Sequence, residues 1–274
     1  MENNRKHHRG RREKKTKGQM VSNIILVIAI AVFLFSGYKL YEIFSEYNKG
    51  ETEYENIQDL VIKKNPVEKT EEDVSQEEAI FSVDFEKLKE MNSETVAWIR
   101  FDEPSQISYP VVKGPDNDKY LHTTFEGKKN SAGTLFVDVD NSGDFTDRNT
   151  FIYGHNMKNG SMFKGLHKFA DSTFFEEHPY IYIYTPDHVL AYKVFAAYTY
   201  DDRHIINSFD FTDKEVFAEY LDDIFHVRAM DANIREDVSV TADDRIITLE
   251  TCVGGDSDAR YLVQAVLIKD GKNE

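Results

Sequence analysis

Residues 245–252 form the run Arg-Ile-Ile-Thr-Leu-Glu-Thr-Cys, and Val253-Gly254-Gly255 follow it. Two isoleucines, a threonine and a leucine predict a β-strand, and the glycines end it. Cys252 is the only cysteine of the chain. At the end of a strand, its thiol can be presented at the edge of a sheet. The alternative is a buried, inert thiol, because most free cysteines pack as small hydrophobic residues.

Strand patterns dominate the chain before and after this run. Polar breaks or breaks rich in Gly, Pro and Asp separate them, and helical patterns interrupt them only at 161–170 and 213–228, the latter with Thr212 as the expected N-cap. A short amphipathic helix is expected over 82–91. We therefore predict a mostly-β fold, a small closed barrel with helices at its rim. The eight expected strands are 95–101, 107–112, 133–137, 149–153, 180–184, 189–200, 245–251 and 261–269.

The N-terminus predicts a membrane anchor. Residues 1–18 contain eight basic and two acidic side chains, and Met20–Tyr38 is a run of 19 residues without a charge. Such a run is long enough to cross a bilayer as a helix. The basic flank should stay in the cytoplasm, which places the rest of the chain outside. A cleaved signal peptide is the alternative, but no small-x-small site follows the apolar run. We expect a cytoplasmic tail at 1–19 and a transmembrane anchor at 20–41.

The remainder of the chain is acidic. The whole chain carries −16, and the +6 of residues 1–18 leaves −22 for residues 19–274. An acidic exterior argues against nucleic-acid binding, which needs a basic face. Glutamates are concentrated in residues 42–81, and Pro66 interrupts them. We expect this stretch to be an extracytoplasmic spacer without a core of its own, followed by one folded domain at 82–274.

A thiol nucleophile needs one group that moves protons and one that holds the developing negative charge. Among nine histidines, His155 is distinguished by its position after the strand 149–153 and Gly154, which resembles the position of Cys252. Arg260 opens the last expected strand, and a guanidinium can donate two hydrogen bonds to a carbonyl or an oxyanion. Taken alone, each of the two could be an ordinary structural or solvated residue. The hypothesis depends on all three together.

Thr248-Leu249-Glu250-Thr251-Cys252 resembles the TLxTC signature of sortases, the membrane-anchored cysteine transpeptidases of Gram-positive bacteria. In that family a histidine precedes the cysteine by a long stretch and an arginine follows it closely, which is the order found here. Residues 149–157, Asn-Thr-Phe-Ile-Tyr-Gly-His-Asn-Met, and Gly-Ser-Met-Phe at 160–163 resemble the histidine region of class B sortases. A helix at 213–228, between the sixth and seventh strands, fits the same class.

The resemblance implies the eight-stranded sortase β-barrel, and it implies roles for single residues. Cys252 resembles the nucleophile that forms a thioacyl intermediate. His155 resembles the general acid and base, and Arg260 the residue that positions the substrate and steadies the oxyanion. Weaker resemblance suggests that four further residues line the peptide groove: Asn117, Leu121, Tyr153 and Thr251.

The resemblance also implies the partners. The substrates would be secreted proteins with a C-terminal sorting signal of the Pro-x-Thr-Gly or Pro-x-Thr-Asn kind, cleaved after Thr. The acceptor would be the amine of a lipid II-like peptidoglycan precursor at the outer face of the cell membrane, with the enzyme anchored as a single-pass type II protein. The resemblance implies no cofactor and no metal.

Three alternatives stay open at this point. A pilin-polymerising class C sortase shares the signature, but its lid motif is absent from residues 42–92. A papain-like peptidase would place the cysteine before the histidine and at the start of a helix. A membrane-anchored β-barrel binding protein with an inert thiol would carry no activity at all.

Overall fold

The computed structural model describes residues 17–64, 81–254 and 258–272. The chain divides into two compact units, 1–46 and 47–274. The described residues of the first unit belong to helix α1 (Lys17–Val61), which continues into the second unit. Within the described residues, α1 is the one helix long and apolar enough to cross a membrane. The predicted tail at 1–19 lies almost wholly outside the described residues.

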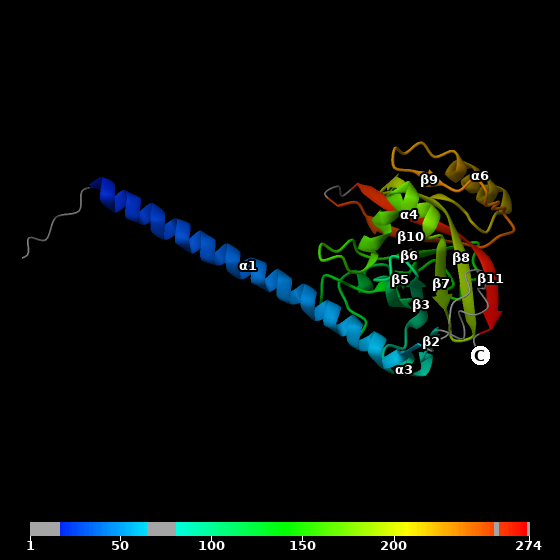
Figure 1. The fold of residues 1–274 in the computed structure, drawn as a ribbon, viewed down its shortest axis with the longest axis horizontal. Coiled ribbons are helices and arrows are strands. Elements are labelled where there is room, and N and C mark those ends of the chain that lie inside the picture. The colour runs from blue at the N-terminus through cyan, green and yellow to red at the C-terminus, as the bar shows by residue number, and fades with distance from the viewer. Residues whose placement is uncertain (1–16, 65–80, 255–257, 273–274) are drawn as a thin grey trace, which may run out of the picture. The chain divides into compact units, whose positions relative to one another are not determined.

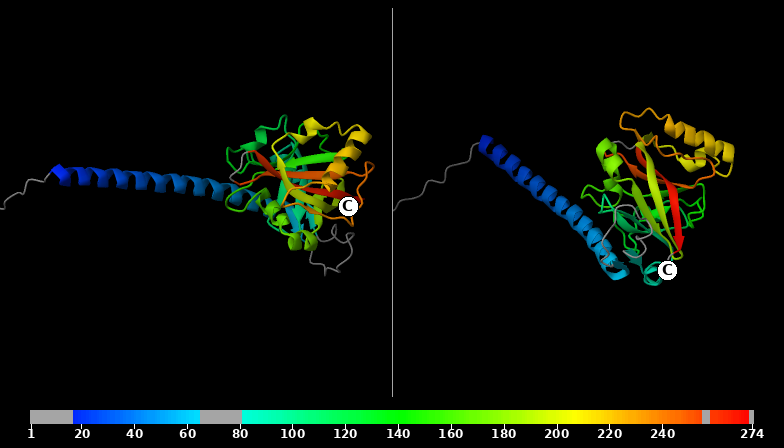
Figure 2. Two further views of the ribbon diagram at one scale, coloured as in Figure 1. Left: turned by 90° about the horizontal axis from the view of Figure 1, so that it is seen from above. Right: turned by 45° about the vertical axis from the view of Figure 1, so that its right-hand side comes forward.

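The second unit is a closed β-barrel (Figures 1 and 2). Its eight strands follow one another in the order β11, β10, β6, β5, β4, β3, β7 and β8, and pairing of β8 with β11 closes the ring. Each corresponds to one predicted strand, so the predicted barrel is confirmed. In the described chain the two-residue strand β9 (Asn233–Ile234) is added beside β8. The barrel strands are β3 (Thr95–Phe101), β4 (Ser108–Val112), β5 (Leu135–Val137), β6 (Asn149–Tyr153), β7 (Tyr180–Tyr184), β8 (His188–Asp201), β10 (Ile246–Cys252) and β11 (Ala259–Lys272).

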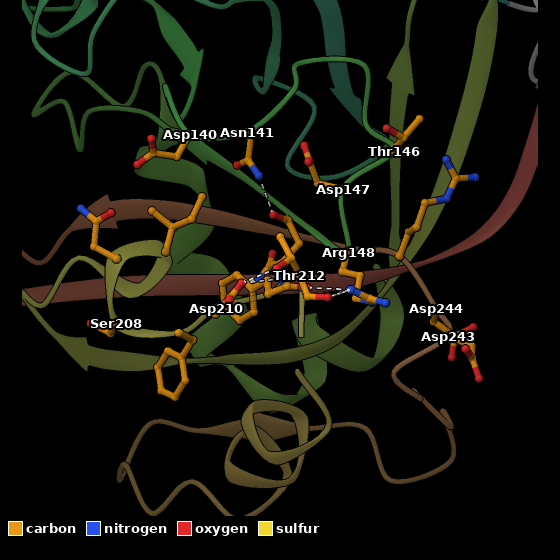
Figure 3. A pocket seen from close by; sticks show the side chains of 16 residues that line it. Asp140, Asn141, Thr146, Asp147, Arg148, Ser208, Asp210, Thr212, Asp243 and Asp244 are labelled. Carbon is orange, nitrogen blue, oxygen red and sulfur yellow. Dashed lines mark hydrogen bonds between the residues drawn. The ribbon is translucent and has the colours of Figure 1, made fainter. Parts of the chain in front are cut away.

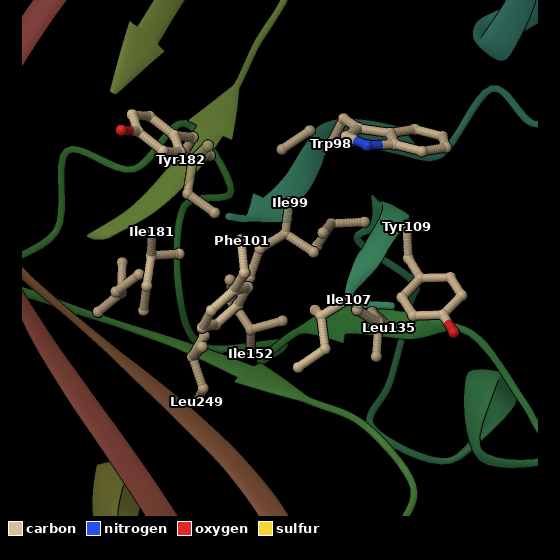
Figure 4. Packing of buried hydrophobic residues seen from close by; sticks show 14 of the residues in the cluster. Trp98, Ile99, Phe101, Ile107, Tyr109, Leu135, Ile152, Ile181, Tyr182 and Leu249 are labelled. Atoms are coloured by element: carbon tan, nitrogen blue, oxygen red, sulfur yellow. The ribbon is translucent and has the colours of Figure 1, made fainter. Parts of the chain in front are cut away.

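Large apolar side chains fill the barrel (Figure 4). Strand residues alternate between the two faces of a sheet, so one face of every strand contributes to this core. Removing such a side chain from water contributes roughly 1.5–3 kcal/mol to stability, so packing in the core is a main source of the barrel's stability. Core residues that are at most 1% exposed include Trp98, Ile99, Phe101, Leu135, Ile152, Ile181 and Leu249.

Helix α6 (Lys214–Phe225) covers a second, smaller apolar cluster outside the barrel. Phe217 and Leu221 are buried there. The N-cap is Asp213, whose carboxylate accepts from the backbone N–H groups of Glu215 and Val216. The expected cap, Thr212, is one residue too early, because its hydroxyl donates to Asp210 instead.

Short helices complete the unit. The helix expected over 82–91 begins later, because residues 82 and 83 belong to strand β2 (Phe81–Val83), and Asp84 caps helix α3 (Phe85–Met91). The segment expected at 161–170 is a 3₁₀ helix. In the described chain the remaining short helices, three of them not predicted, are η2 (Lys119–Leu121), η3 (Phe163–Ala170), α4 (Ser172–Glu177) and α5 (Ile205–Ser208).

The segment expected to be a spacer differs from the prediction in its described part. Residues 42–61 continue α1, and strand β1 (Ile62–Lys64) pairs with β2. Tyr54, Ile57 and Val61 are at most 3% exposed and belong to the barrel core. They recur at helical spacing, so one face of the helix is apolar although its composition is acidic. The folded unit therefore begins at Tyr47 rather than at 82. Residues 65–80 of the predicted spacer lie outside the described residues.

Candidate active site

Strand pairing brings the predicted residues together. Strands β6 and β10 are parallel, with Tyr153 opposite Glu250, so their carboxyl ends lie at the same edge of the barrel. The N–H of Gly154 donates to the carbonyl of Glu250 at 3.1 Å and extends this ladder to the residue before His155. A Cβ at Gly154 would lie 2.3 Å from Leu135 Cδ2, so a side chain does not fit here. This explains why glycine precedes the histidine.

Cys252 ends β10 and is exposed. Its partner across the antiparallel ladder to β11 is Arg260. The thiol and the guanidinium are therefore carried by adjacent strands at one register position. The sequence points to both residues, and the register of the two strands shows that they are neighbours.

A cavity of about 350 Å³ opens at this edge. All seven residues predicted as catalytic or substrate-binding lie in its wall. The structure adds four that the sequence did not single out. The predicted set is Asn117, Leu121, Tyr153, His155, Thr251, Cys252 and Arg260, and the added set is Phe136, Gly154, His204 and Glu250.

His155 is held from one side of its ring. Nε2 lies 2.7 Å from the carbonyl oxygen of Leu121, and because a carbonyl only accepts, Nε2 must carry the proton. In the neutral ring Nδ1 is then the basic atom. Burial lowers the pKa of His155, the Leu121 carbonyl raises it in part, and the neighbouring His122 lowers it. The imidazole is therefore neutral at neutral pH and able to accept a proton.

Arg260 lies next to a half-buried carboxylate. Its Nε is 3.4 Å from Oε1 of Glu250. Burial raises the pKa of Glu250 to about 7, Arg260 opposes this rise, and the charge of Asp138 adds to it. Glu250 therefore changes charge close to neutral pH, next to the guanidinium.

Asp138, fully buried, organises another part of the wall. It accepts a hydrogen bond from the Tyr153 hydroxyl at 2.7 Å and from the Asn117 amide at 3.1 Å. His204 Nε2 lies 3.0 Å from the same carboxylate. Burial raises the pKa of Tyr153 above its ordinary value, and the charge of Asp138 adds to this effect. Two of the predicted groove residues are thus fixed by one carboxylate.

The backbone of Cys252 is held from a different loop. The Asn156 amide donates to the Cys252 carbonyl at 2.7 Å, and His167 Nε2 lies 3.1 Å from the same oxygen. Asn156 comes directly after His155, so one loop supplies both the ring and this support. Sequence spacing alone gives no sign of this contact.

A second cavity of about 800 Å³ is more polar (Figure 3). None of the seven predicted site residues, all of them described, lines it. Its two arginines are engaged in structural contacts: Arg148 donates to the carbonyls of Phe211 and Thr212 at 2.9 and 2.7 Å, and Arg245 pairs with Asp270 at 2.8 Å. Five aspartates also line it, namely Asp140, Asp147, Asp210, Asp243 and Asp244.

Across the ranges 17–64, 81–254 and 258–272 there is no group of three or more His, Cys, Asp or Glu side chains arranged to hold a metal ion. The wall of the 350 Å³ cavity offers a thiol, imidazole rings, a guanidinium and a carboxyl group.

Known proteins resemble this chain in sequence and in fold. The sortase domain family matches residues 103–268. Sortase B of Listeria monocytogenes is 32% identical over 239 residues, which cover 87% of this chain and 92% of the relative. Sortase B of Staphylococcus aureus is 30% identical over 253 residues, 91% of this chain and 96% of the relative. The crystal structure of sortase B from Bacillus anthracis has a TM-score of 0.68 and 33% identity, and the match covers 83% of this chain and all of that one. The chain therefore belongs to the sortase family, and its relatives named here are all class B sortases.

Proposed function

We propose that this sortase transpeptidase uses Cys252 as its nucleophile, His155 as its general acid and base, and Arg260 as its oxyanion and substrate ligand. One observation supports this assignment: all three residues line the same cavity. They come from three separate places in the chain, and the pairing of β6, β10 and β11 brings those places to one edge.

The reaction proceeds in two halves. The sulfur of Cys252 attacks the carbonyl carbon of the sorting-motif threonine and passes its proton to Nδ1 of His155. The C–N bond breaks, His155 protonates the leaving amine, and a thioacyl bond remains. An incoming amine then attacks that carbonyl carbon and loses a proton to His155, the C–S bond breaks, and His155 returns that proton to the sulfur to restore the thiol. Proton transfer of this kind contributes roughly 10²–10⁴-fold in rate.

The environment of His155 suits this role. The Leu121 carbonyl fixes the proton on Nε2, so Nδ1 is the atom that exchanges protons in both halves. The lowered pKa keeps the ring neutral before the thiol is deprotonated. Arg260 then donates to the oxygen that gains negative charge, and the planar fork of arginine suits a carbonyl oxygen.

The proposed substrate is a secreted protein with a C-terminal Pro-x-Thr-Gly or Pro-x-Thr-Asn motif, cleaved after Thr. The proposed groove consists of Asn117, Leu121, Tyr153 and Thr251. The Asp138 carboxylate holds the first and third of these in fixed positions, which favours a defined peptide path. The proposed acceptor is the amine of a lipid II-like peptidoglycan precursor.

We place the catalytic unit outside the cell membrane, as a single-pass type II protein. The apolar part of α1, residues 20–41, would cross the bilayer, and the basic residues before it would remain in the cytoplasm. A membrane-impermeant thiol reagent added to intact cells should then label Cys252. Labelling that requires lysis of the cells would contradict this topology.

Cleavage and transfer test the proposed chemistry directly. The full chain in detergent micelles is incubated with a library of fluorogenic Pro-x-Thr-containing pentapeptides and with triglycine as an amine acceptor. Mass spectrometry should find cleavage after Thr and a threonyl-triglycine product. Cys252→Ala should abolish both, and His155→Ala should lower kcat by roughly 10²–10⁴-fold. Equal turnover by Cys252→Ala would refute the assignment, and peptide binding without turnover by the parent would favour a binding protein.

A further inference from the structure

The C-terminal part of α1, residues 47–61, packs on the barrel next to the loop 120–134. Tyr54 and Glu53 of this segment are 3% and 6% exposed, and each makes a polar contact with that loop. The Tyr54 hydroxyl donates to the carbonyl of Gly133 and lies 3.2 Å from Thr134 Oγ1. The hydrogen bond from this buried hydroxyl therefore links the loop to the helix.

Glu53 holds the middle of the same loop. Its carboxylate accepts from the backbone N–H of Glu126 at 3.0 Å and lies 3.3 Å from Nζ of Lys128. A carboxylate almost removed from water must have such partners, because an unpaired buried charge is costly. The loop is thus held at two points by consecutive residues of one helix.

Contacts within the loop connect these points to Leu121. The Thr134 hydroxyl donates to the Thr123 carbonyl at 2.8 Å, and the Thr134 N–H donates to the Tyr120 carbonyl at 2.9 Å. Gly133, with φ of +58°, packs so closely that a Cβ would lie 2.4 Å from the Tyr120 oxygen and 2.9 Å from the Leu121 oxygen. The two ends of the loop therefore lie against each other, and a shift of Gly133 would move Leu121.

The Leu121 carbonyl oxygen accepts the hydrogen bond from Nε2–H of His155, at 2.7 Å. A continuous set of contacts therefore runs from α1 through the loop to the ring. We propose that Tyr54 and Glu53 are positioning residues for catalysis: they fix the loop 120–134, and through the Leu121 carbonyl they fix the tautomer and orientation of His155. This inference rests on the proposed role of His155.

The loss of either contact should release the loop and weaken the hydrogen bond from Nε2. The rate of proton transfer should then fall, since a ring that can turn or change tautomer presents Nδ1 to the thiol only part of the time. The Leu121 carbonyl also raises the pKa of His155, so weakening this contact should lower that pKa further. Other titratable groups near the ring or in the same cavity wall, which the variants leave unchanged, are His122, His204, Glu250, Cys252 and Arg260.

The test compares variants of the full chain in detergent micelles. Tyr54→Phe removes only the hydroxyl and keeps the ring that packs edge-on against Tyr109. Glu53→Ala removes the acceptor, whereas Glu53→Gln keeps an acceptor for the Glu126 N–H. The matched control is Gln58→Leu, because Gln58 also joins α1 to the barrel but does so at the Ser108 carbonyl, outside the loop 120–134.

Tyr54→Phe and Glu53→Ala should lower kcat about fivefold to tenfold, the effect of losing one hydrogen bond. Glu53→Gln and Gln58→Leu should have a kcat within about twofold of that of the parent. The NMR titration of His155, followed at Cε1–H, should shift to lower pH in the two impaired variants alone. This titration does not require turnover, so it tests the positioning even if the proposed reaction fails.

Two results would overturn the inference. One is a His155 titration midpoint in Tyr54→Phe equal to that of the parent. The other is an equal loss of kcat in Gln58→Leu, which would mean that any weakened contact between α1 and the barrel lowers activity. Should Tyr54→Phe not fold, the pair Glu53→Ala and Glu53→Gln decides by the same two readouts. A parent that cleaves no peptide would instead count against the proposed function.

Discussion

The side-chain amide of Asn156 donates a hydrogen bond of 2.7 Å to the backbone carbonyl of Cys252. Asn156 follows the proposed general base directly, so the loop after β6 supports the end of β10 as well as supplying the imidazole. We therefore expect the position of the thiol relative to the imidazole to depend on this hydrogen bond.

Asn156→Ala should leave the fold intact and lower kcat/KM by about tenfold, because a hydrogen bond of this kind contributes roughly 1 kcal/mol or slightly more. Peptide cleavage kinetics measure the effect. Asn159→Ala is the control, because the Asn159 carboxamide accepts a hydrogen bond of 2.8 Å from the Ser161 hydroxyl of its own loop. Equal losses in both variants would mean that the loop as a whole, rather than the contact with Cys252, is responsible.

Arg260→Lys keeps the charge but loses the planar fork, so kcat/KM should fall by about tenfold or more. Arg203→Lys is the matched control, because Arg203 is exposed, pairs with Asp201 and does not itself line the cavity. Full activity in Arg260→Lys would show that charge alone suffices at this position.

The stability of the protein should depend on Glu250 through pH. Its pKa in the folded chain is about 7, above the ordinary value of 4.5, so the folded state binds more protons between these values. The stabilising contribution is complete below about pH 4.5 and is lost as pH rises through 7. The rise in pKa corresponds to roughly 3 kcal/mol of unfolding free energy.

Glu250→Gln removes this dependence, so its stability relative to the parent should increase from pH 5 to pH 8. Urea unfolding at both values measures the difference. Glu236→Gln, at an exposed position, is the control. A relative stability that falls over the same interval would contradict the sign of the effect.

A fragment of residues 82–274 should be less stable than one of residues 47–274. The shorter fragment lacks Tyr54, Ile57 and Val61, each at most 3% exposed, and the strand that pairs with β2. Burial of each side chain is worth roughly 1.5–3 kcal/mol, so Tm should fall on the order of 10 °C. Equal Tm values in a calorimetric scan would mean that α1 contributes nothing to the core.

The barrel could be predicted because each strand has its own local pattern. The strands 149–153 and 180–184 have the predicted bounds in the structure. The position of His155 followed from the same reasoning, since a strand end beside glycine is a local signal. Segment 42–61 was misjudged because its glutamates dominate the composition, although Tyr54, Ile57 and Val61 already mark an apolar face.

The other residues of the cavity have no local signal. Asp138 lies near Tyr153 because β5 pairs with β6. His204, which contacts Asp138 and Tyr153, follows Tyr153 by 51 positions in the sequence. Glu250 stands at the variable position of the signature, so the motif gives no reason to choose it. Contacts of this kind depend on strand register and on the path of the loops, which a single sequence does not reveal.

Strand β11 pairs with β10 on one side and with β8 on the other. The chain between β8 and β10, residues 202–245, therefore begins and ends on strands that a third strand already aligns. It carries α5, α6 and the cavity residue His204. Its packing on Phe151 and Leu262 is separate from the register that sets Cys252 opposite Arg260. Changes in the path of this segment should therefore alter the His204 side of the cavity, while the strand pairing that aligns Cys252 and Arg260 stays the same.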